Sequence, residues 1–489
     1  MQKRIFTLAV FFLIAFSLLF LQLNNLQVLQ AQKLSNANGN NNQITKEFSL
    51  PRGAILTADG KVIADTVSAK NVYHYQREYP YGSLYGDVTG FDSIIYGRSG
   101  LEASYNSYLQ GSLAPPNSIS SLFSTKYQTD SVVTTINSTL QETAAKALGS
   151  LYGAVVAIDP KTGSILALYS APSFDPNPLS SPSGSVETAA WKLYNLGTYP
   201  PLLDLATSRS FPPGSTFKIV TSSAVYDHDP AIATQSFPVE SVTKLPQTTL
   251  TLHNYAYEAC GGTLPVLLQV SCDTGFANIG LELGASNLAQ EAAAFGFNAV
   301  PPLDVPGAAA SYFPPASFFS QNLPQLAYSA IGQGNDSATP LQMALVASAI
   351  ANHGVIETPH LMSEIVNYQN QVIRRYQPHP WKIATSAQTA AKVTSLMEGV
   401  VNGGTAQGIA LPGVKIAAKT GTAQTNLSSG STATGRDDNW MVAFAPAQNP
   451  QIAVAVVVPQ QPGLSPNPTG AQYAGPVVKA MLAAALGVG

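Results

Sequence analysis

Residues 210–220 place a serine and a lysine three positions apart, directly after two prolines and a glycine. The prolines oppose α-helix before this point, and the apolar spacing of residues 216–226 predicts a buried helix that begins near Ser215. Residues three apart share a helix face, so the amine of Lys218 can reach the hydroxyl of Ser215. Burial lowers the proton affinity of a lysine, and a helix N-terminus favours a developing alkoxide. The pair is typical of an activated nucleophile with its base, although an N-capping serine beside an extended lysine gives the same pattern.

A second segment has the composition of a strand that binds an anionic peptide end. Lys419, Thr420, Gly421 and Thr422 supply a cation, two hydroxyls and a residue without a side chain. An edge strand of this kind can pair with an extended peptide whose terminal carboxylate meets the lysine and the threonines. The same Lys-Thr-Gly tripeptide at residues 161–163 follows Asp-Pro, and there we predict an ordinary hairpin turn.

Ser271, Cys272 and Asp273 form a third candidate segment. Serine and aspartate both favour helix caps, so this triplet by itself indicates no more than the start of a helix. Because the other two segments supply a nucleophile with its base and an anion-binding strand, Ser271 is a candidate proton relay in a nucleophilic reaction.

Short elements around these segments predict the scaffold that positions them. Residues 138–153 and 337–354 have helical patterns, whereas residues 154–170 and 439–459 have the pattern of strand pairs. Strands at both ends with helices between them predict an α+β domain whose sheet combines distant segments. We therefore expect a domain over residues 131–489.

The first part of the chain predicts a membrane anchor and a smaller module. Residues 5–23 contain no charge, and at 1.5 Å per residue they extend roughly 29 Å, enough to cross a bilayer core. Lys3 and Arg4 before this stretch predict a cytoplasmic N-terminus with the rest of the chain outside. We predict an uncleaved anchor within residues 1–25, and a module rich in short strands over residues 26–130.

That N-terminal module begins with a linker and a turn. Residues 35–43 have the composition of a polar linker, and Asp59-Gly60 has the pattern of a turn between two strands.

Composition argues against nucleic-acid partners, and the cysteine count leaves open whether a disulfide forms. Charged residues make up 10 % of the 489 residues and the net charge is −3, which gives no support for nucleic-acid binding. The only two cysteines are Cys260 and Cys272, and outside the cell they form either a disulfide or free buried thiols. Two cysteines without accompanying histidines do not indicate a zinc site.

The order of the three segments resembles the motif set of penicillin-binding proteins and β-lactamases. Residues 52–64 and 97–111 resemble the N-terminal module of the monofunctional class B penicillin-binding proteins, and the cysteine pair resembles the actinobacterial branch of that family. Three further segments resemble its transpeptidase domain: residues 153–177, 331–344 and 438–446.

This resemblance implies a transpeptidase domain with a mainly antiparallel sheet flanked by helices. It implies a D,D-transpeptidase acting on the D-Ala-D-Ala end of peptidoglycan stem peptides, and covalent inhibition by β-lactams. Lys218 would deprotonate Ser215, Ser271 would relay a proton, and Lys419 with Thr420, Gly421 and Thr422 would bind the substrate. No metal or organic cofactor is expected, and the expected partner is a SEDS-type glycosyltransferase in the membrane.

The sequence departs from the family pattern at two places. The family usually has asparagine where Asp273 stands, and tends to have Asn-Arg where Asp204 and Leu205 stand. A carboxylate near Lys218 favours its ammonium form, so we expect Asp273→Asn to speed acylation at neutral pH and to matter less as pH falls. The second departure is expected to alter local packing. Two other functions stay open: a catalytically weakened scaffold, and a β-lactamase or β-lactam sensor.

Overall fold

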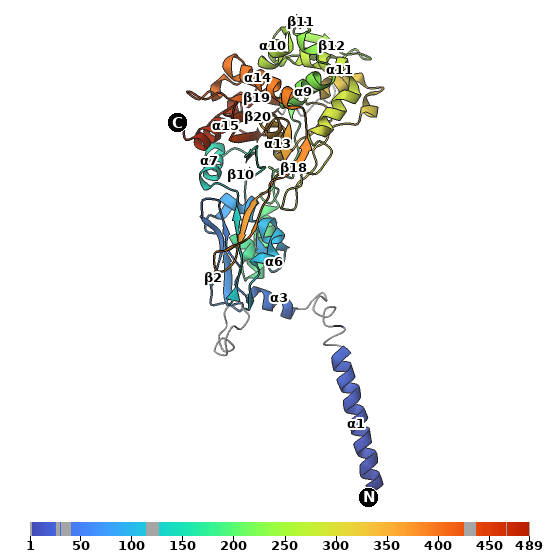
Figure 1. Cartoon of the computed structure of the whole chain (residues 1–489), viewed down its shortest axis with the longest axis vertical. Coiled ribbons are helices and arrows are strands. Elements are labelled where there is room, and N and C mark those ends of the chain that lie inside the picture. The colour runs from blue at the N-terminus through green and yellow to red at the C-terminus, as the bar shows by residue number, and fades with distance from the viewer. Residues whose placement is uncertain are drawn as a thin grey trace.

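Helix α1 (Gln2–Asn24) stands apart from the rest of the molecule in the computed structural model (Figure 1). The model describes residues 2–25, 30, 41–113, 127–424, 437–465 and 467–488. Within these ranges, Phe6–Asn24 is the one helical segment long and apolar enough to cross a membrane, and none of it is buried. The predicted linker lies partly outside the described residues, and its end was wrong, because residues 41–43 belong to helix α3 (Asn41–Phe48).

The lower body in Figure 1 contains a six-stranded sheet in the order β17-β16-β8-β1-β2-β3. The predicted hairpin around Asp59-Gly60 is confirmed as the antiparallel pair β1–β2. Only β1 and β8 run parallel, and β16 and β17 join the sheet from far along the chain. This module therefore takes strands from both sides of residue 130. The strands are β1 (Ile55–Leu56), β2 (Val62–Ser68), β3 (Tyr75–Glu78), β8 (Ser131–Thr134), β16 (Met362–Val366) and β17 (Val372–Arg375).

Buried ion pairs join the two N-terminal segments that carry the family resemblance. Arg52 Nη2 lies 2.7 Å from Glu102 Oε2, and Arg77 Nε lies 2.6 Å from Glu102 Oε1. Arg52 also lies 3.4 Å from Asp92. Removing one partner would leave an uncompensated buried charge, so this cluster fixes how the helices of residues 100–109 lie against the sheet.

The upper body is built on a five-stranded sheet in the order β10-β9-β21-β20-β19. Every neighbouring pair in it is antiparallel, and both strand pairs expected from residues 154–170 and 439–459 are confirmed. The sheet joins segments almost 300 residues apart, because β21 pairs with β9. The strands are β9 (Gly153–Ile158), β10 (Ile165–Ala171), β19 (Ala417–Gln424), β20 (Asp437–Ala445) and β21 (Ile452–Val458).

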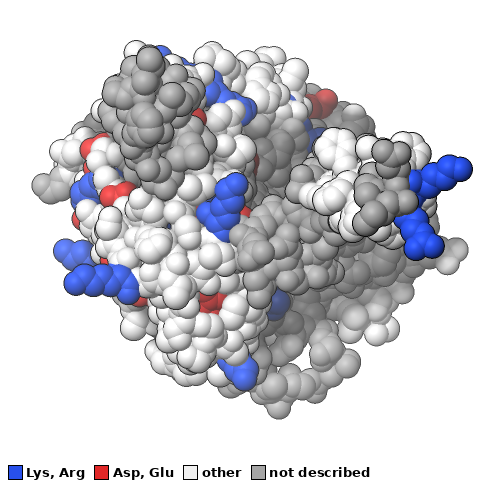
Figure 2. All heavy atoms as spheres, turned by 90° about the horizontal axis from the view of Figure 1, so that it is seen from below, with Lys and Arg blue, Asp and Glu red and all other residues white. Residues whose placement is uncertain are grey.

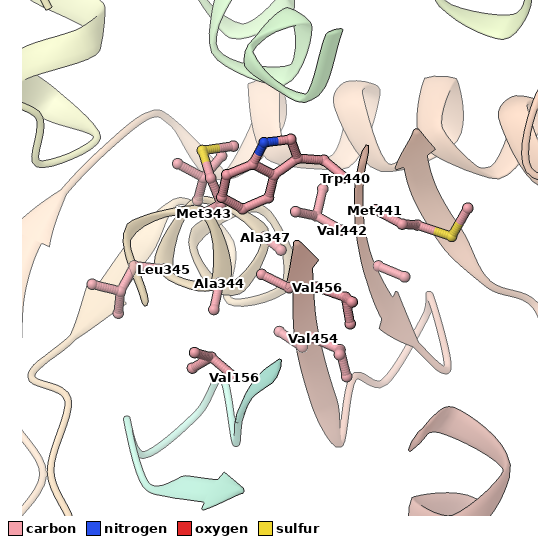
Figure 3. Packing of buried hydrophobic residues seen from close by; sticks show 14 of the residues in the cluster. Val156, Met343, Ala344, Leu345, Ala347, Trp440, Met441, Val442, Val454 and Val456 are labelled. Atoms are coloured by element: carbon pink, nitrogen blue, oxygen red, sulfur yellow. The ribbon is translucent and has the colours of Figure 1, made fainter. Parts of the chain in front are cut away.

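Helices cover both faces of this sheet. Helix α13 (Pro340–Ala351) packs on one face, while α7 (Ser138–Leu148) and α15 (Gly470–Leu486) pack on the other. Every residue of α13 is buried, as expected for a helix that is apolar all round. Figure 3 shows Trp440 on the α13 side and Met441 pointing away from it, the alternation of a strand covered on both faces.

The remaining helices and short strands build the region above the sheet and complete the N-terminal module. The helices are α4 (Gly86–Thr89), α5 (Gly100–Ser104), α6 (Asn106–Leu109), α8 (Gly184–Tyr194), α9 (Lys218–His228), α10 (Leu264–Gln269), α11 (Asp273–Ala294), α12 (Leu323–Ser329) and α14 (Ala387–Gly403). The paired strands are β4 (Asp92–Ser93) with β5 (Gly97–Arg98), β6 (Ser112–Leu113) with β7 (Tyr127–Gln128), β11 (Phe237–Glu240) with β14 (Cys260–Gly262), β12 (Val242–Lys244) with β13 (Thr251–His253), and β15 (Val355–Glu357) with β18 (Pro380–Ile383). Short 3-10 turns, labelled η, connect them.

The surface carries few charges. On the face seen from the α1 end in Figure 2, Lys, Arg, Asp and Glu side chains are scattered among uncharged residues. This agrees with the low charged fraction of the sequence.

Candidate active site

Ser215 lies at the junction of the sheet and the helical region. It belongs to the 3-10 turn η5 (Gly214–Phe217), and the α-helix begins at Lys218, three residues later than predicted. Ser215 is 8 % exposed, and the residues just before its turn are held by the indole of Trp440, which donates to the carbonyl of Pro212 at 2.9 Å. The nucleophile candidate therefore sits on a turn braced by the central sheet.

Glycines allow this turn to approach strand β19 closely. A Cβ on Gly421 would come within 3.0 Å of the carbonyl oxygen of Pro213 and of Trp440 Cβ. Gly214 has φ +52°, and a Cβ there would come within 3.0 Å of the carbonyl oxygen of Thr422. Side chains at either position would push Ser215 away from the strand, since such contacts are shorter than ordinary packing allows.

Lys218 is buried and directs its amine at the loop that begins α11. Its Nζ lies 2.7 Å from Asp273 Oδ1, 2.8 Å from the carbonyl oxygen of Ser271 and 3.4 Å from Ser271 Oγ. These three acceptors match the three N–H donors of an ammonium group. Ser215, the partner expected from the sequence, is not among its hydrogen-bond partners in the described part of the chain. Burial lowers the pKa of Lys218, and the charge of Asp273 opposes that shift.

Lys419, on strand β19, contacts the loop that carries Ser271. Its Nζ donates to Ser271 Oγ at 2.8 Å and to the carbonyl oxygen of Thr420 at 2.9 Å. Burial lowers the pKa of Lys419 well below its ordinary value, and the nearby charge of Lys218 adds to the effect. Ser271 Oγ thus lies within hydrogen-bond distance of both lysines, so a proton could pass through it.

Residues outside the three predicted segments hold the loop that carries Ser271 in place. Ser271 has φ +62°, a left-handed conformation uncommon for a residue with a side chain. A disulfide joins Cys272 to Cys260 in β14, so the alternative of free thiols does not hold. Asn254 Oδ1 accepts from the backbone N–H of Thr274 at 2.8 Å, and its amide donates to the carbonyl of Glu258 at 2.9 Å. Sequence reasoning missed Asn254, because no local pattern distinguishes it from a turn residue.

The loop that carries Ser271 borders a cleft of about 400 Å³. Ser215, Ser271, Asp273, Thr420 and Thr422 line it. Strand β19 pairs only with β20 among the described strands, so its other edge is free to pair with a peptide. Sequence reasoning did not identify the other lining residues: Thr251, Leu252, His253, Tyr255, Glu258, Val270, Tyr328, Ile331, Gln333, Thr405, Asp437, Thr469, Gly470 and Ala471.

The second Lys-Thr-Gly tripeptide lies away from this cleft, as predicted. Residues 161–163 form the turn between β9 and β10, where Asp159 accepts from the backbone N–H of Lys161 at 2.9 Å. Gly163 has φ +75°, the conformation that a tight turn requires. The side chain of Lys161 is exposed and donates to Asn449, so the same tripeptide serves only as a turn here.

Asp204 and Leu205, the other departure from the family pattern, have packing contacts. Asp204 Oδ1 accepts from Ser170 Oγ at 2.9 Å and from the backbone N–H of Ala206 at 2.8 Å. Leu205 is buried in the main core.

Comparison with known proteins decides the family. The model of the penicillin-binding protein transpeptidase domain matches residues 153–483, and that of the penicillin-binding protein A dimerisation domain matches residues 52–132. The chain belongs to the penicillin-binding protein transpeptidase family. The resemblance found in the sequence is thereby confirmed, as is the α+β fold with its antiparallel sheet.

Relatives of this penicillin-binding protein align along almost its whole length. It is 36 % identical to the peptidoglycan D,D-transpeptidase PbpA of Mycolicibacterium smegmatis, with 94 % of each chain covered. It is 34 % identical to PbpA of Mycobacterium tuberculosis, with 96 % of each chain covered. The structure of penicillin-binding protein A from M. tuberculosis as a ceftriaxone acyl-enzyme complex superposes with a TM-score of 0.81 at 33 % identity, over 90 % of this chain and 100 % of that one.

Proposed function

We propose that this protein is a peptidoglycan D,D-transpeptidase that works through an acyl-enzyme at Ser215 and is trapped there by β-lactams. The observation that carries the proposal is that Ser215 and Ser271 line one cleft beside the free edge of β19, while two buried lysines, Lys218 and Lys419, contact Ser271 Oγ. In a chain of this family, that arrangement supports acyl transfer from a peptide that ends in D-Ala-D-Ala.

In the first half of the reaction, neutral Lys218 takes the proton of Ser215 as the serine oxygen attacks the carbonyl carbon of the penultimate D-Ala. A neutral Lys218 has only two N–H groups and needs its lone pair for the proton of Ser215. It must therefore release at least one of its three acceptors, and we assign that acceptor as Asp273. We assign the backbone N–H groups of Ser215 and Thr422 as donors to the oxyanion. Each such donor typically lowers the barrier by about 3 kcal/mol.

The terminal D-Ala then leaves and a second amine replaces it. The C–N bond breaks, and Ser271 passes a proton to the departing amine from the two lysines that contact it. An amine of a neighbouring stem attacks the ester, and Ser215 recovers its proton as the new peptide bond forms. We assign Lys419, Thr420, Gly421 and Thr422 to the peptide's carboxylate end, which suits a buried cation on an edge strand.

We expect Asp273→Asn to speed benzylpenicillin acylation at neutral pH. The carboxylate lies 2.7 Å from Lys218 Nζ and favours the ammonium form, which cannot accept a proton from Ser215. Asparagine removes that charge, so the pKa of Lys218 falls and more of it is neutral. The difference between the two rates is expected to become smaller as pH falls. Stopped-flow acylation rates across a pH series decide this; equal rates throughout would contradict a role for the carboxylate.

We also propose that α1 anchors the protein in the membrane with its N-terminus in the cytoplasm. Lys3 and Arg4 precede the apolar segment, and basic residues favour the cytoplasmic side. The catalytic domain would then lie outside the cell, where its substrate is. A SEDS-type glycosyltransferase is the proposed partner, and co-purification from detergent-solubilised membranes tests that assignment.

Mass spectrometry after treatment with benzylpenicillin tests the proposed function. We expect a single stable adduct on the peptide that contains Ser215, and loss of D-Ala-dependent cross-linking of stem peptides in the same sample. Rapid release of the adduct by hydrolysis would indicate a β-lactamase. Absence of any adduct would indicate a non-catalytic scaffold.

A further inference from the structure

Asp437 is a carboxylate in the cleft lining that has no assigned role. It is 9 % exposed and lines the cleft at the first position of strand β20. Its Oδ1 is buried and has no hydrogen-bond partner among the described residues. Burial raises the pKa of Asp437, as expected for a charge without a compensating partner. A bound cation would supply that partner.

The strand register places Asp437 in line with the substrate-binding threonines. Thr422 pairs with Asn439, and Gln424 pairs with Asp437, two positions further along β19. Because side chains alternate along a strand, Thr420, Thr422 and position 424 share one face, and the paired Asp437 belongs to the same face. Positions 422 and 424 are about 6.8 Å apart along β19, a distance that one long side chain can span.

The direction of a bound peptide follows from the proposed chemistry. Its carboxylate end lies at Lys419 and Thr420, and its scissile carbonyl lies beside Ser215 and Thr422. The residues before the scissile bond therefore run along the free edge of β19 toward position 424 and Asp437.

The acidic lining of the cleft favours a cation. The lining includes three acidic residues, Glu258, Asp273 and Asp437, and no lysine or arginine among its described members. Lys218 pairs with Asp273, whereas Glu258 and Asp437 have no ion pair in the described part of the chain. The start of α15 at Thr469 and Gly470 also lines the cleft, and the backbone N–H of Gly470 donates to Thr422 Oγ1 at 3.4 Å.

We propose that Asp437 binds an ammonium-bearing side chain on the donor peptide, upstream of the scissile bond. This inference rests on the proposed transpeptidase function and adds to it a determinant of substrate choice. Stem peptides that supply an amine as acceptor carry such a side chain, so the same amine on the donor strand would be recognised here.

The test compares two N-acetylated tripeptides that end in D-Ala-D-Ala and begin with either L-lysine or L-norleucine. Norleucine has the same aliphatic chain without the amine. For the full-length protein in detergent, we expect kcat/KM for D-Ala release to be about tenfold higher with the lysine peptide, as for one charge-assisted hydrogen bond. In Asp437→Asn, the ratio of the two kcat/KM values should fall to about one. This ratio does not depend on the fraction of active protein.

Asp438→Asn is the matched control, since Asp438 is the next residue of β20, belongs to the opposite face and does not line the cleft. It should keep the wild-type ratio. A ratio unchanged in Asp437→Asn, or lost in Asp438→Asn, would overturn the proposal. Benzylpenicillin carries no ammonium group, so failure of wild-type Ser215 to form the penicillin adduct would count against the transpeptidase function instead.

Discussion

Replacing Ser215 with alanine is expected to abolish covalent labelling by fluorescent penicillin. The substitution removes only the hydroxyl, and no described residue is hydrogen-bonded to that hydroxyl, so the fold should persist. Without the nucleophile no ester can form, whatever the remaining groups contribute to binding. Gel fluorescence of purified membranes measures the loss, and thermal unfolding of the purified protein should shift by no more than a few degrees.

Ser210→Ala is the control for this experiment, because Ser210 lies in the same segment but outside the cleft lining. It should label like the wild type. Persistent labelling of Ser215→Ala would mean that another residue carries the acyl group, and the assignment of the nucleophile would then be wrong.

Replacing Lys218 with alanine should reduce the acylation rate almost as severely. General-base catalysis typically contributes about 10²- to 10⁴-fold, so we expect a loss of that order in the second-order rate constant for benzylpenicillin. The single variant also leaves Asp273 without its cation, and removing one member of a buried pair typically costs about 3–5 kcal/mol. Loss of activity could then reflect loss of folded protein.

The double variant Lys218→Ala/Asp273→Asn separates loss of the base from loss of folded protein, since it removes both charges together. It should recover thermal stability but not acylation. Lys161→Ala, at the exposed turn that repeats the Lys-Thr-Gly sequence, should acylate normally. Acylation of the double variant at the wild-type rate would exclude Lys218 as the base.

Local sequence patterns were sufficient to predict the individual elements. The uncharged stretch of residues 5–23 became α1, and the apolar runs on either side of the Asp-Pro turn in residues 154–170 became the hairpin β9–β10. These outcomes depend on short-range properties, namely the periodicity of apolar residues and the conformational limits of proline and glycine. Likewise, the Asp-Pro before Lys161 was enough to separate a turn from a binding strand.

The sequence by itself therefore determined the elements, the three segments that could carry the chemistry and, through their order, the family. Only the tertiary structure decided which groups meet. In the structure, Lys218 contacts Asp273 and is not hydrogen-bonded to Ser215. Strands β16 and β17 pair into the N-terminal sheet, and Asp437 lines the cleft. Each of these contacts joins segments far apart in the chain, so each depends on how the helices pack and how the strands pair, which no local pattern of residues records.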